Sequence, residues 1–200
     1  MKKFLLAAVL VFLAAPVFAD TVDVFNFNQN LGDIGQTDLL KLGLVQFLIS
    51  GFNTPGVAGD LWEKNLGPTE FGLGLMNQVD HEIGIGGTDF AQLDISKLAA
   101  LKSVVSVSVG INSLQAGENY DIWGSNTAGS LGTLIAANQT DPNFTLPLAP
   151  FQFISITAGS GDVLIDDVIV TTTPENSTAI FLFLGGVMLA GGSLLSKKFR

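Results

Sequence analysis

The chain has 200 residues, of which 48% are hydrophobic and only 14% are charged, and it contains no cysteine. Soluble domains carry about 25% charged residues, so this scarcity of charge suggests membrane-directed segments. Without cysteine there are no disulfides, zinc–thiolate sites or cysteine nucleophiles. Between Asp20 and Ser196 four lysines stand against all 18 acidic residues, a net charge of −14. This excludes nucleic acid as a partner, because such binding needs a basic surface.

The first 19 residues are typical of a secretory signal peptide. Lys2 and Lys3 precede an uninterrupted apolar run from Phe4 to Ala15, Pro16 breaks the run, and a cleavage site precedes Asp20. The alternative is an uncleaved membrane anchor, but this run is short for a span that needs roughly 20 residues. We expect residues 1–19 to be removed.

Residues 20–172 form the exported part, rich in glycine and in short apolar runs that are typical of strands separated by turns. Between 104 and 111, Val105, Val107, Val109 and Ile111 alternate with serines and are expected on one face. Only 37–42 and 96–102 are expected to be helical. The pattern predicts an all-β fold, a single β-sandwich of jelly-roll type. The predicted strands are 21–27, 44–52, 61–64, 70–76, 90–95, 104–111, 120–124, 151–157 and 163–171.

A second membrane-directed segment lies at the other end of the chain. Ser177 to Ser196 is a stretch of 20 residues without a charge. At about 1.5 Å per residue a helix of this length crosses a ~30 Å hydrocarbon core. The basic residues in 197–200 predict that the C-terminus stays in the cytoplasm. The bulk of the chain then lies outside.

The residues before this stretch are Thr173-Pro174-Glu175-Asn176-Ser177-Thr178. With the apolar helix and the basic end they resemble the PEP-CTERM sorting signal of exported bacterial proteins. Pro174, Glu175, Ser177 and Thr178 match its motif, and Asn176 stands where a proline is usual. The resemblance covers 173–200, with the motif at 174–178, the transmembrane helix at 177–196 and the basic tail at 197–200. The alternative is an ordinary single-span anchor.

The resemblance implies a partner and a destination. The partner is an exosortase-type membrane protease or transpeptidase, which acts on a precursor anchored in the inner membrane by its C-terminal helix. The product then reaches the cell surface or the extracellular matrix. The exported part is also similar to β-sandwich proteins that carry the same tail, over segments 61–64, 70–75, 80–83, 90–94 and 120–125. That similarity implies no activity.

The densest polar cluster is a candidate for acid–base chemistry, although carboxylates at strand ends more often bind loop amides or Ca²⁺. The chain has neither a Gly-x-Ser-x-Gly elbow nor a His-Glu-x-x-His helix. We therefore expect no catalytic residues and no enzyme. The cluster consists of Glu70, Asp80, His81, Glu82, Asp89 and Asp94.

Asp166 and Asp167 are adjacent acids within an apolar strand. The segment from Asp162 to Val168 resembles the last strand of many carbohydrate-binding jelly rolls, where such acids help to hold a structural Ca²⁺ beside the first strand. If the strand alternates regularly, one of the two acids points into the sandwich and needs a partner or a metal. The alternatives are hydrogen bonds to loop amides, or a bulge that places both acids in water. No cofactor is required, and Ca²⁺ is the candidate ion.

Trp62, Tyr120 and Trp123 are candidates for stacking on sugar rings, and the alternative for each is a place in the core or at its edge. Two functional hypotheses follow. One is a non-catalytic structural protein of the cell surface or of the exopolysaccharide-rich biofilm matrix. The other is a carbohydrate-binding module for extracellular polysaccharide, with a glycan-active enzyme a more distant third.

Overall fold

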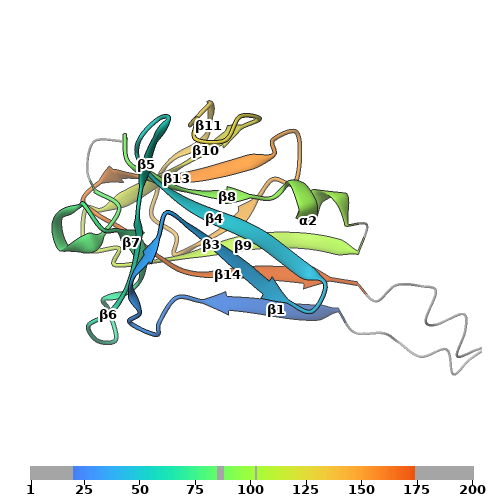
Figure 1. Ribbon diagram of the computed structural model, residues 1–200, viewed down its shortest axis with the longest axis horizontal. Helices are drawn as coiled ribbons and strands as arrows, with labels where there is room; N and C mark the ends of the chain where they lie inside the picture. The colour runs from blue at the N-terminus through green and yellow to red at the C-terminus, as the bar shows by residue number, and fades with distance from the viewer. Residues whose placement is uncertain (1–19, 85–87, 102, 174–200) are drawn as a thin grey trace, which may run out of the picture. The chain divides into compact units, whose positions relative to one another are not determined.

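The computed structural model of the protein describes residues 20–84, 88–101 and 103–173. Its compact unit spans Val22–Thr172 and consists mainly of strands, which form two antiparallel sheets (Figure 1). The predicted all-β class is therefore confirmed. Buried residues of both sheets belong to one hydrophobic cluster, an arrangement consistent with a β-sandwich.

Each sheet has seven strands among the described residues. Sheet A has the order β12-β9-β14-β7-β6-β2, with β1 also paired to β14. Its strands are β1 (Thr21–Asn26), β2 (Gly32–Gly35), β6 (Leu61–Asn65), β7 (Phe71–Leu75), β9 (Val104–Asn112), β12 (Asn143–Leu146) and β14 (Leu164–Thr172). Sheet B has the order β11-β10-β13-β8-β4-β3, with β5 also paired to β4. Its strands are β3 (Thr37–Leu42), β4 (Val45–Thr54), β5 (Val57–Gly59), β8 (Phe90–Asp94), β10 (Asn119–Ser125), β11 (Thr133–Gln139) and β13 (Phe153–Ser160).

The last eight strands pair in a nested order. β7 pairs with β14, β8 with β13, β9 with β12, and β10 with β11, and each pair is antiparallel. β14 also pairs with β9, and β13 with β10, so the pairs join into the two sheets. The first six strands extend this arrangement. The helical elements among the described residues are α2 (Ser96–Ala100) and the 3-10 turn η1 (Val79–His81).

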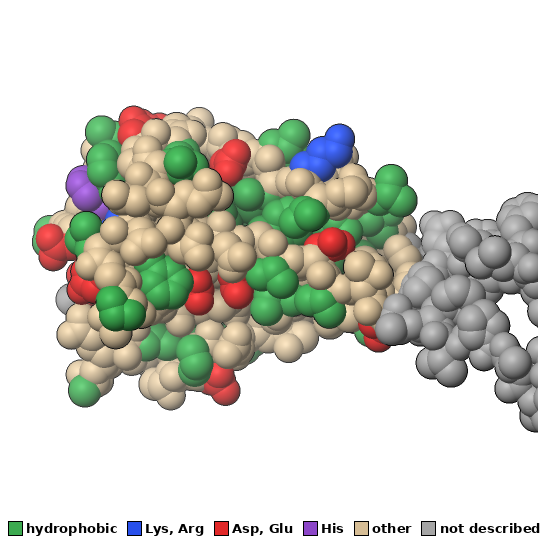
Figure 2. Space-filling view, turned by 90° about the horizontal axis from the view of Figure 1, so that it is seen from below, with side chains coloured by type: hydrophobic (Ala, Val, Ile, Leu, Met, Phe, Trp, Pro, Cys, Tyr) green, Lys and Arg blue, Asp and Glu red, His purple; other side chains and the backbone are tan. Residues whose placement is uncertain are grey.

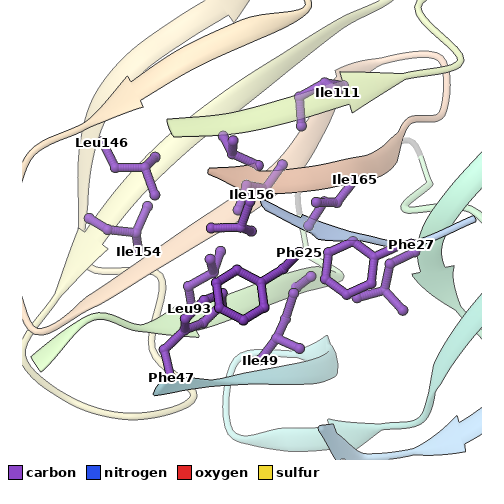
Figure 3. Packing of buried hydrophobic residues seen from close by; sticks show 14 of the residues in the cluster. Phe25, Phe27, Phe47, Ile49, Leu93, Ile111, Leu146, Ile154, Ile156 and Ile165 are labelled. Atoms are coloured by element: carbon purple, nitrogen blue, oxygen red, sulfur yellow. The ribbon is translucent and has the colours of Figure 1, made fainter. Parts of the chain in front are cut away.

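The core lies between the sheets and is filled by aliphatic and phenylalanine side chains (Figure 3). Phe25 of sheet A meets Phe47 of sheet B edge to face, with their ring centroids 5.0 Å apart. Phe27, Ile49 and Ile165 are part of the same cluster. Because these side chains come from both sheets, the two layers share one core.

Nine predicted strands and the helix at 96–100 are present, with ends shifted by a few residues. The helical prediction for 37–42 is wrong. This segment is β3, because Gly43, at φ +57°, lets the chain turn back so that Leu42 pairs with Val45. The prediction that Val105 lies on the same face as Val107 is also wrong. Val105 is 53% exposed, because a register break places Val104 against the core in its stead. Strands β2, β5, β11 and β12 were not predicted.

Candidate functional site

Asp166 and Asp167 lie next to each other on the outer side of sheet A. β14 shifts register against β9 between Ile165 and Asp167, so it accommodates an extra residue in a β-bulge. Ile165 and Val168 both belong to the core, and the two acids between them do not. Regular alternation, which would point one acid into the sandwich, does not hold, and the alternative of a bulge is found, with both acids half-buried. In Figure 2, acidic side chains lie in the middle of the face, between hydrophobic ones.

The acidic pair is crowded and half-buried. A Cβ at Gly110 of β9 would lie 2.5 Å from Asp167 Oδ1 and 3.6 Å from Asp166 Cβ, so this strand leaves room for the acids only because it has glycine there. Burial raises the pKa of both carboxyls. The charge of Asp167 raises the pKa of Asp166 further, and a hydrogen bond from the Gly110 N–H opposes the rise for Asp167. A proton or a cation on the pair would relieve this repulsion.

The pair fits calcium in the kind of donor it offers. Asp167 Oδ1 is buried and has no hydrogen-bond partner within the described part of the chain. The first strand lies beside the pair, since the Phe27 N–H donates to the Asp166 carbonyl at 2.9 Å. Calcium takes about six to eight oxygen ligands. No three His, Cys, Asp or Glu side chains in residues 20–84, 88–101 and 103–173 gather to hold a metal ion. Carbonyl groups, amides or water would have to complete the shell.

Trp123 of β10 lies on the outer face of sheet B, because its neighbour Ile122 points into the core. The Trp123 Nε1–H donates to Thr157 Oγ1 at 3.0 Å, which fixes the plane of the half-buried indole. Trp123 pairs with Leu134 on the neighbouring strand β11, and Leu134 is exposed. The structure thus keeps Trp123 as a stacking candidate.

Tyr120 is not a stacking residue. Its side chain is fully buried in the core, and its hydroxyl donates to the Asp141 carbonyl at 2.7 Å. Burial, with the nearby charge of Asp141, raises its pKa to about 12. Trp62 is half-buried on β6. His81 stacks on it at 4.1 Å between ring centroids, and Gly32 lies against the end of its ring. At most one face of Trp62 is open to a ligand.

No family model, curated protein or solved structure matches the chain. The sorting residues Pro174, Glu175, Ser177 and Thr178, and the stretch 177–196, lie outside the described residues. None of the helices in the described ranges is long and apolar enough to span a membrane.

Lys64 organises the centre of the predicted acidic cluster. Its ammonium group donates to Glu82 Oε1, to the Asp80 carbonyl at 3.0 Å and to Glu70 Oε2 at 3.4 Å. The side chains of Lys64 and Glu82 are both buried. Burial raises the pKa of Glu82, and the hydrogen bond and charge of Lys64 oppose that rise. The interaction fastens segment 76–84 to β6.

The other members of the cluster make separate local bonds. His81 shares a 2.8 Å hydrogen bond between its Nδ1 and the Met76 carbonyl. Asp89 accepts from the Gly84 N–H at 2.8 Å, and burial raises its pKa. Asp94 accepts from the Ser96 N–H at 3.0 Å. Asp89 and Asp94 therefore hold local turns, while Glu70 and Glu82 meet at Lys64.

Glu63 and Gln92 are buried polar residues that no sequence pattern singles out. Glu63 accepts from the Gln29 N–H, and Gln92 fastens the 129–130 loop to sheet B. Gln92 Nε2 donates to the Ser130 carbonyl at 3.0 Å, and its Oε1 accepts from the Gly129 N–H at 2.8 Å. In the sequence, Gln92 is noticeable only as an amide within the apolar run 90–93. That run gives no indication of the groups to which it hydrogen-bonds.

Proposed function

We propose that this chain is an exported surface or extracellular-matrix protein with a non-catalytic structural role, sorted and processed by an exosortase. The arrangement of the tail carries the proposal: a Pro-Glu motif, a charge-free stretch and a basic end, in that order, with a signal peptide at the opposite terminus. β14 ends at Thr172, so only Thr173 separates the last strand from Pro174. A processing enzyme would meet the motif just outside the hydrogen-bonded sheet.

Mass spectrometry of the protein released from its own bacterium tests this proposal. The mature chain is expected to begin at Asp20 and to end between Thr172 and Thr178. Replacing Pro174 and Glu175 by alanine should leave the precursor in the membrane, whereas Glu118→Ala, in a distant loop, should be processed normally. Released protein that still ends at Arg200 would overturn the proposal.

We further propose that the sandwich is a jelly roll formed by β7 to β14. The nested pairs β7–β14, β8–β13, β9–β12 and β10–β11 support this, because a jelly roll is a long antiparallel hairpin wound over two sheets. On this view β1 to β6 are additions to the eight-stranded unit.

Binding of extracellular polysaccharide is the second candidate function, and Trp123 is the observation that favours it. Its indole is held by Thr157 and lies beside exposed Leu134 on the face of sheet B. The acidic exported part is repelled by acidic glycans, so stacking on neutral sugars, or Ca²⁺ bridging, would supply the contact. Trp123→Ala should abolish capture by the producer's own exopolysaccharide, while Trp62→Ala should not. Equal capture by both variants would remove Trp123 from the site.

A further inference from the structure

One end of the sandwich carries the exit of the chain from the last strand. Thr172, the last residue of β14, pairs with Val104 at the start of β9. Helix α2 comes just before β9, and the Val104 N–H donates to the Leu101 carbonyl at 3.1 Å. Figure 1 shows the turn between β3 and β4, helix α2, the start of β1 and the end of β14 together at the right. We call this region the exit end.

The surface of the exit end combines apolar and basic side chains. Leu42 and Leu44 flank the turn between β3 and β4, and they are 43% and 87% exposed. Lys41 on β3 and Lys97 on α2 are also exposed. The other lysine within the described residues, Lys64, is buried in its ion pair with Glu82. Both exposed lysines of the described ranges therefore lie at this end, and Figure 2 shows a blue group at the upper right of the coloured domain.

The charge of the exit end differs from that of the rest of the domain. Three acids lie there, Asp20, Asp23 and Asp94, and Asp94 is already bound to the Ser96 N–H and hydroxyl. The middle and the far end of the domain carry the remaining acids, with Lys64 as the described basic residue among them. The exit end is therefore the part of this acidic protein that an anionic surface repels least.

The sequence limits how far the exit end can lie from a bilayer. Ser177, the first residue of the charge-free stretch, follows Thr172 by five positions. A fully extended chain spans at most about 3.6 Å per residue, so the reach is about 18 Å. While the tail is retained in a membrane, the end of β14 must stay within that distance of the lipid interface.

We propose that in the unprocessed precursor the exit end docks on the outer leaflet of the inner membrane, with Leu42 and Leu44 at the lipid interface and Lys41 and Lys97 facing anionic headgroups. This rests on the proposed topology and adds an orientation to it. Interfacial binding grows with buried apolar area and with attraction between basic residues and anionic lipid. A second copy of the chain would also cover two leucines, but the tether places lipid, not a copy, within reach of every molecule.

The docking holds the domain upright on its tether and keeps the sorting motif at the membrane surface. Two leucines and two lysines give shallow, reversible binding, since stable attachment of a soluble domain needs more than one strong signal. Cleavage near Pro174 would therefore release the domain, because the tether that kept the exit end at the interface is gone.

The absence of native cysteine allows a direct test on the full chain. Leu44→Cys and Val79→Cys are each labelled with an environment-sensitive dye and reconstituted in phosphatidylglycerol–phosphatidylcholine vesicles with a lipid-borne quencher. Val79 is the matched control: it is 77% exposed and belongs to η1, away from the exit end. The label at 44 should be blue-shifted and quenched several-fold more than the label at 79. Equal quenching in chains that float with the vesicles overturns the docking and leaves the anchor intact.

Two further outcomes complete the test. Chains that fail to float with the vesicles overturn the proposed anchor, and the docking with it. A blue shift at position 44 without lipid quenching shows self-association and also overturns the docking.

Lys41→Gln combined with Lys97→Gln should lower the quenching at 44 in anionic vesicles to the level seen in pure phosphatidylcholine. Unchanged quenching would remove the headgroup contact.

Discussion

Lys64 links β6 to Glu70 and to segment 76–84. Its ammonium group bonds to two carboxylates and one carbonyl, and Glu82 Oε2 is already buried without a partner among the described residues. Lys64→Met should therefore cost about 3–5 kcal/mol of unfolding free energy, because it leaves a buried carboxylate unpaired. Lys64→Met with Glu82→Leu should recover most of that loss. Urea denaturation of residues 20–173 measures both, and additive losses would contradict the assignment.

Asp166 and Asp167 set a pH dependence of stability. Burial raises their pKa in the folded state, so the folded protein binds protons at these carboxyls more tightly than the unfolded chain does. The unfolding free energy should fall as the pH rises from about 3.9, the ordinary Asp value, through the raised pKa values. Asp167→Asn should flatten this fall. Urea midpoints across the window measure it, and a variant that keeps the wild-type slope would contradict the cause.

The same pair gives a calcium prediction. A Ca²⁺ ion that binds only the folded form stabilises it by about 2.7 kcal/mol at a hundredfold excess over its Kd. For a domain of this size each kcal/mol moves Tm by about 2–4 °C, so the shift should reach several degrees. Melting in millimolar calcium and in chelator measures the shift. Asp166→Asn should abolish the shift in Tm and Asp121→Asn should not. Wild-type melting curves that coincide with and without calcium would contradict a calcium site at this pair.

The position of segment 76–84 depends on a glycine in the neighbouring strand β7, where any side chain would collide with the segment. A Cβ at Gly74 of β7 would lie 2.1 Å from the His81 carbonyl oxygen, which is backbone and cannot swing aside. Gly74→Ala should cost about 1–3 kcal/mol, in the range of overpacked cores, and should separate His81 from Trp62. Trp62 fluorescence in a Trp123→Phe background measures the separation. Gly84→Ala is the matched control, since the atoms nearest its Cβ would be side-chain ends, Gln78 Oε1 at 3.2 Å and Asp89 Oδ2 at 3.7 Å, and not backbone. An unchanged spectrum in the Gly74 variant would show that the segment is not held this way.

The strands that the sequence predicted are those with a buried face, such as β4, β9 and β14, where apolar residues at alternate positions report the core directly. β2 and β11 are edge strands without a fully buried residue, so they carry no such pattern. In β3 the run Leu39-Leu40 suits a helix as well as a strand, and only pairing with β4 decides between them.

The candidate site was predictable in its residues but not in its geometry. Adjacent acids in an apolar strand drew attention to Asp166 and Asp167, yet the bulge depends on pairing with β9, which no local pattern reveals. Tyr120 and Trp123 are three residues apart on the same strand and have opposite fates, because Tyr120 faces the core and Trp123 lies across the strand from it. Asp80 and Glu82, two of the partners of Lys64, are brought to it by the fold of 76–84, which the sequence alone does not show.

At the scale of the whole molecule, the shared core predicts that the two sheets unfold together. The chain has two tryptophans, and the structure places Trp62 in sheet A and Trp123 in sheet B. Trp62→Phe and Trp123→Phe each leave one tryptophan as a reporter of one sheet. After correction for the effect of each substitution on stability, the two reporters should give the same urea midpoint. Phe25→Ala should lower the unfolding free energy by about 3–5 kcal/mol, and by the same amount whether Trp62 or Trp123 is the reporter. A shift confined to Trp62 would show that the sheets are separate units.

The position of β14 also has a mechanical consequence. The tail continues from this strand, which is paired to β9 along one edge and to β7 and β1 along the other. A pull on the tail acts along the strand axis, so the bonds on both edges resist sliding together instead of opening one after another, as they would at the rim of a sheet. A force applied through the tail would thus act on a strand that is paired along both of its edges.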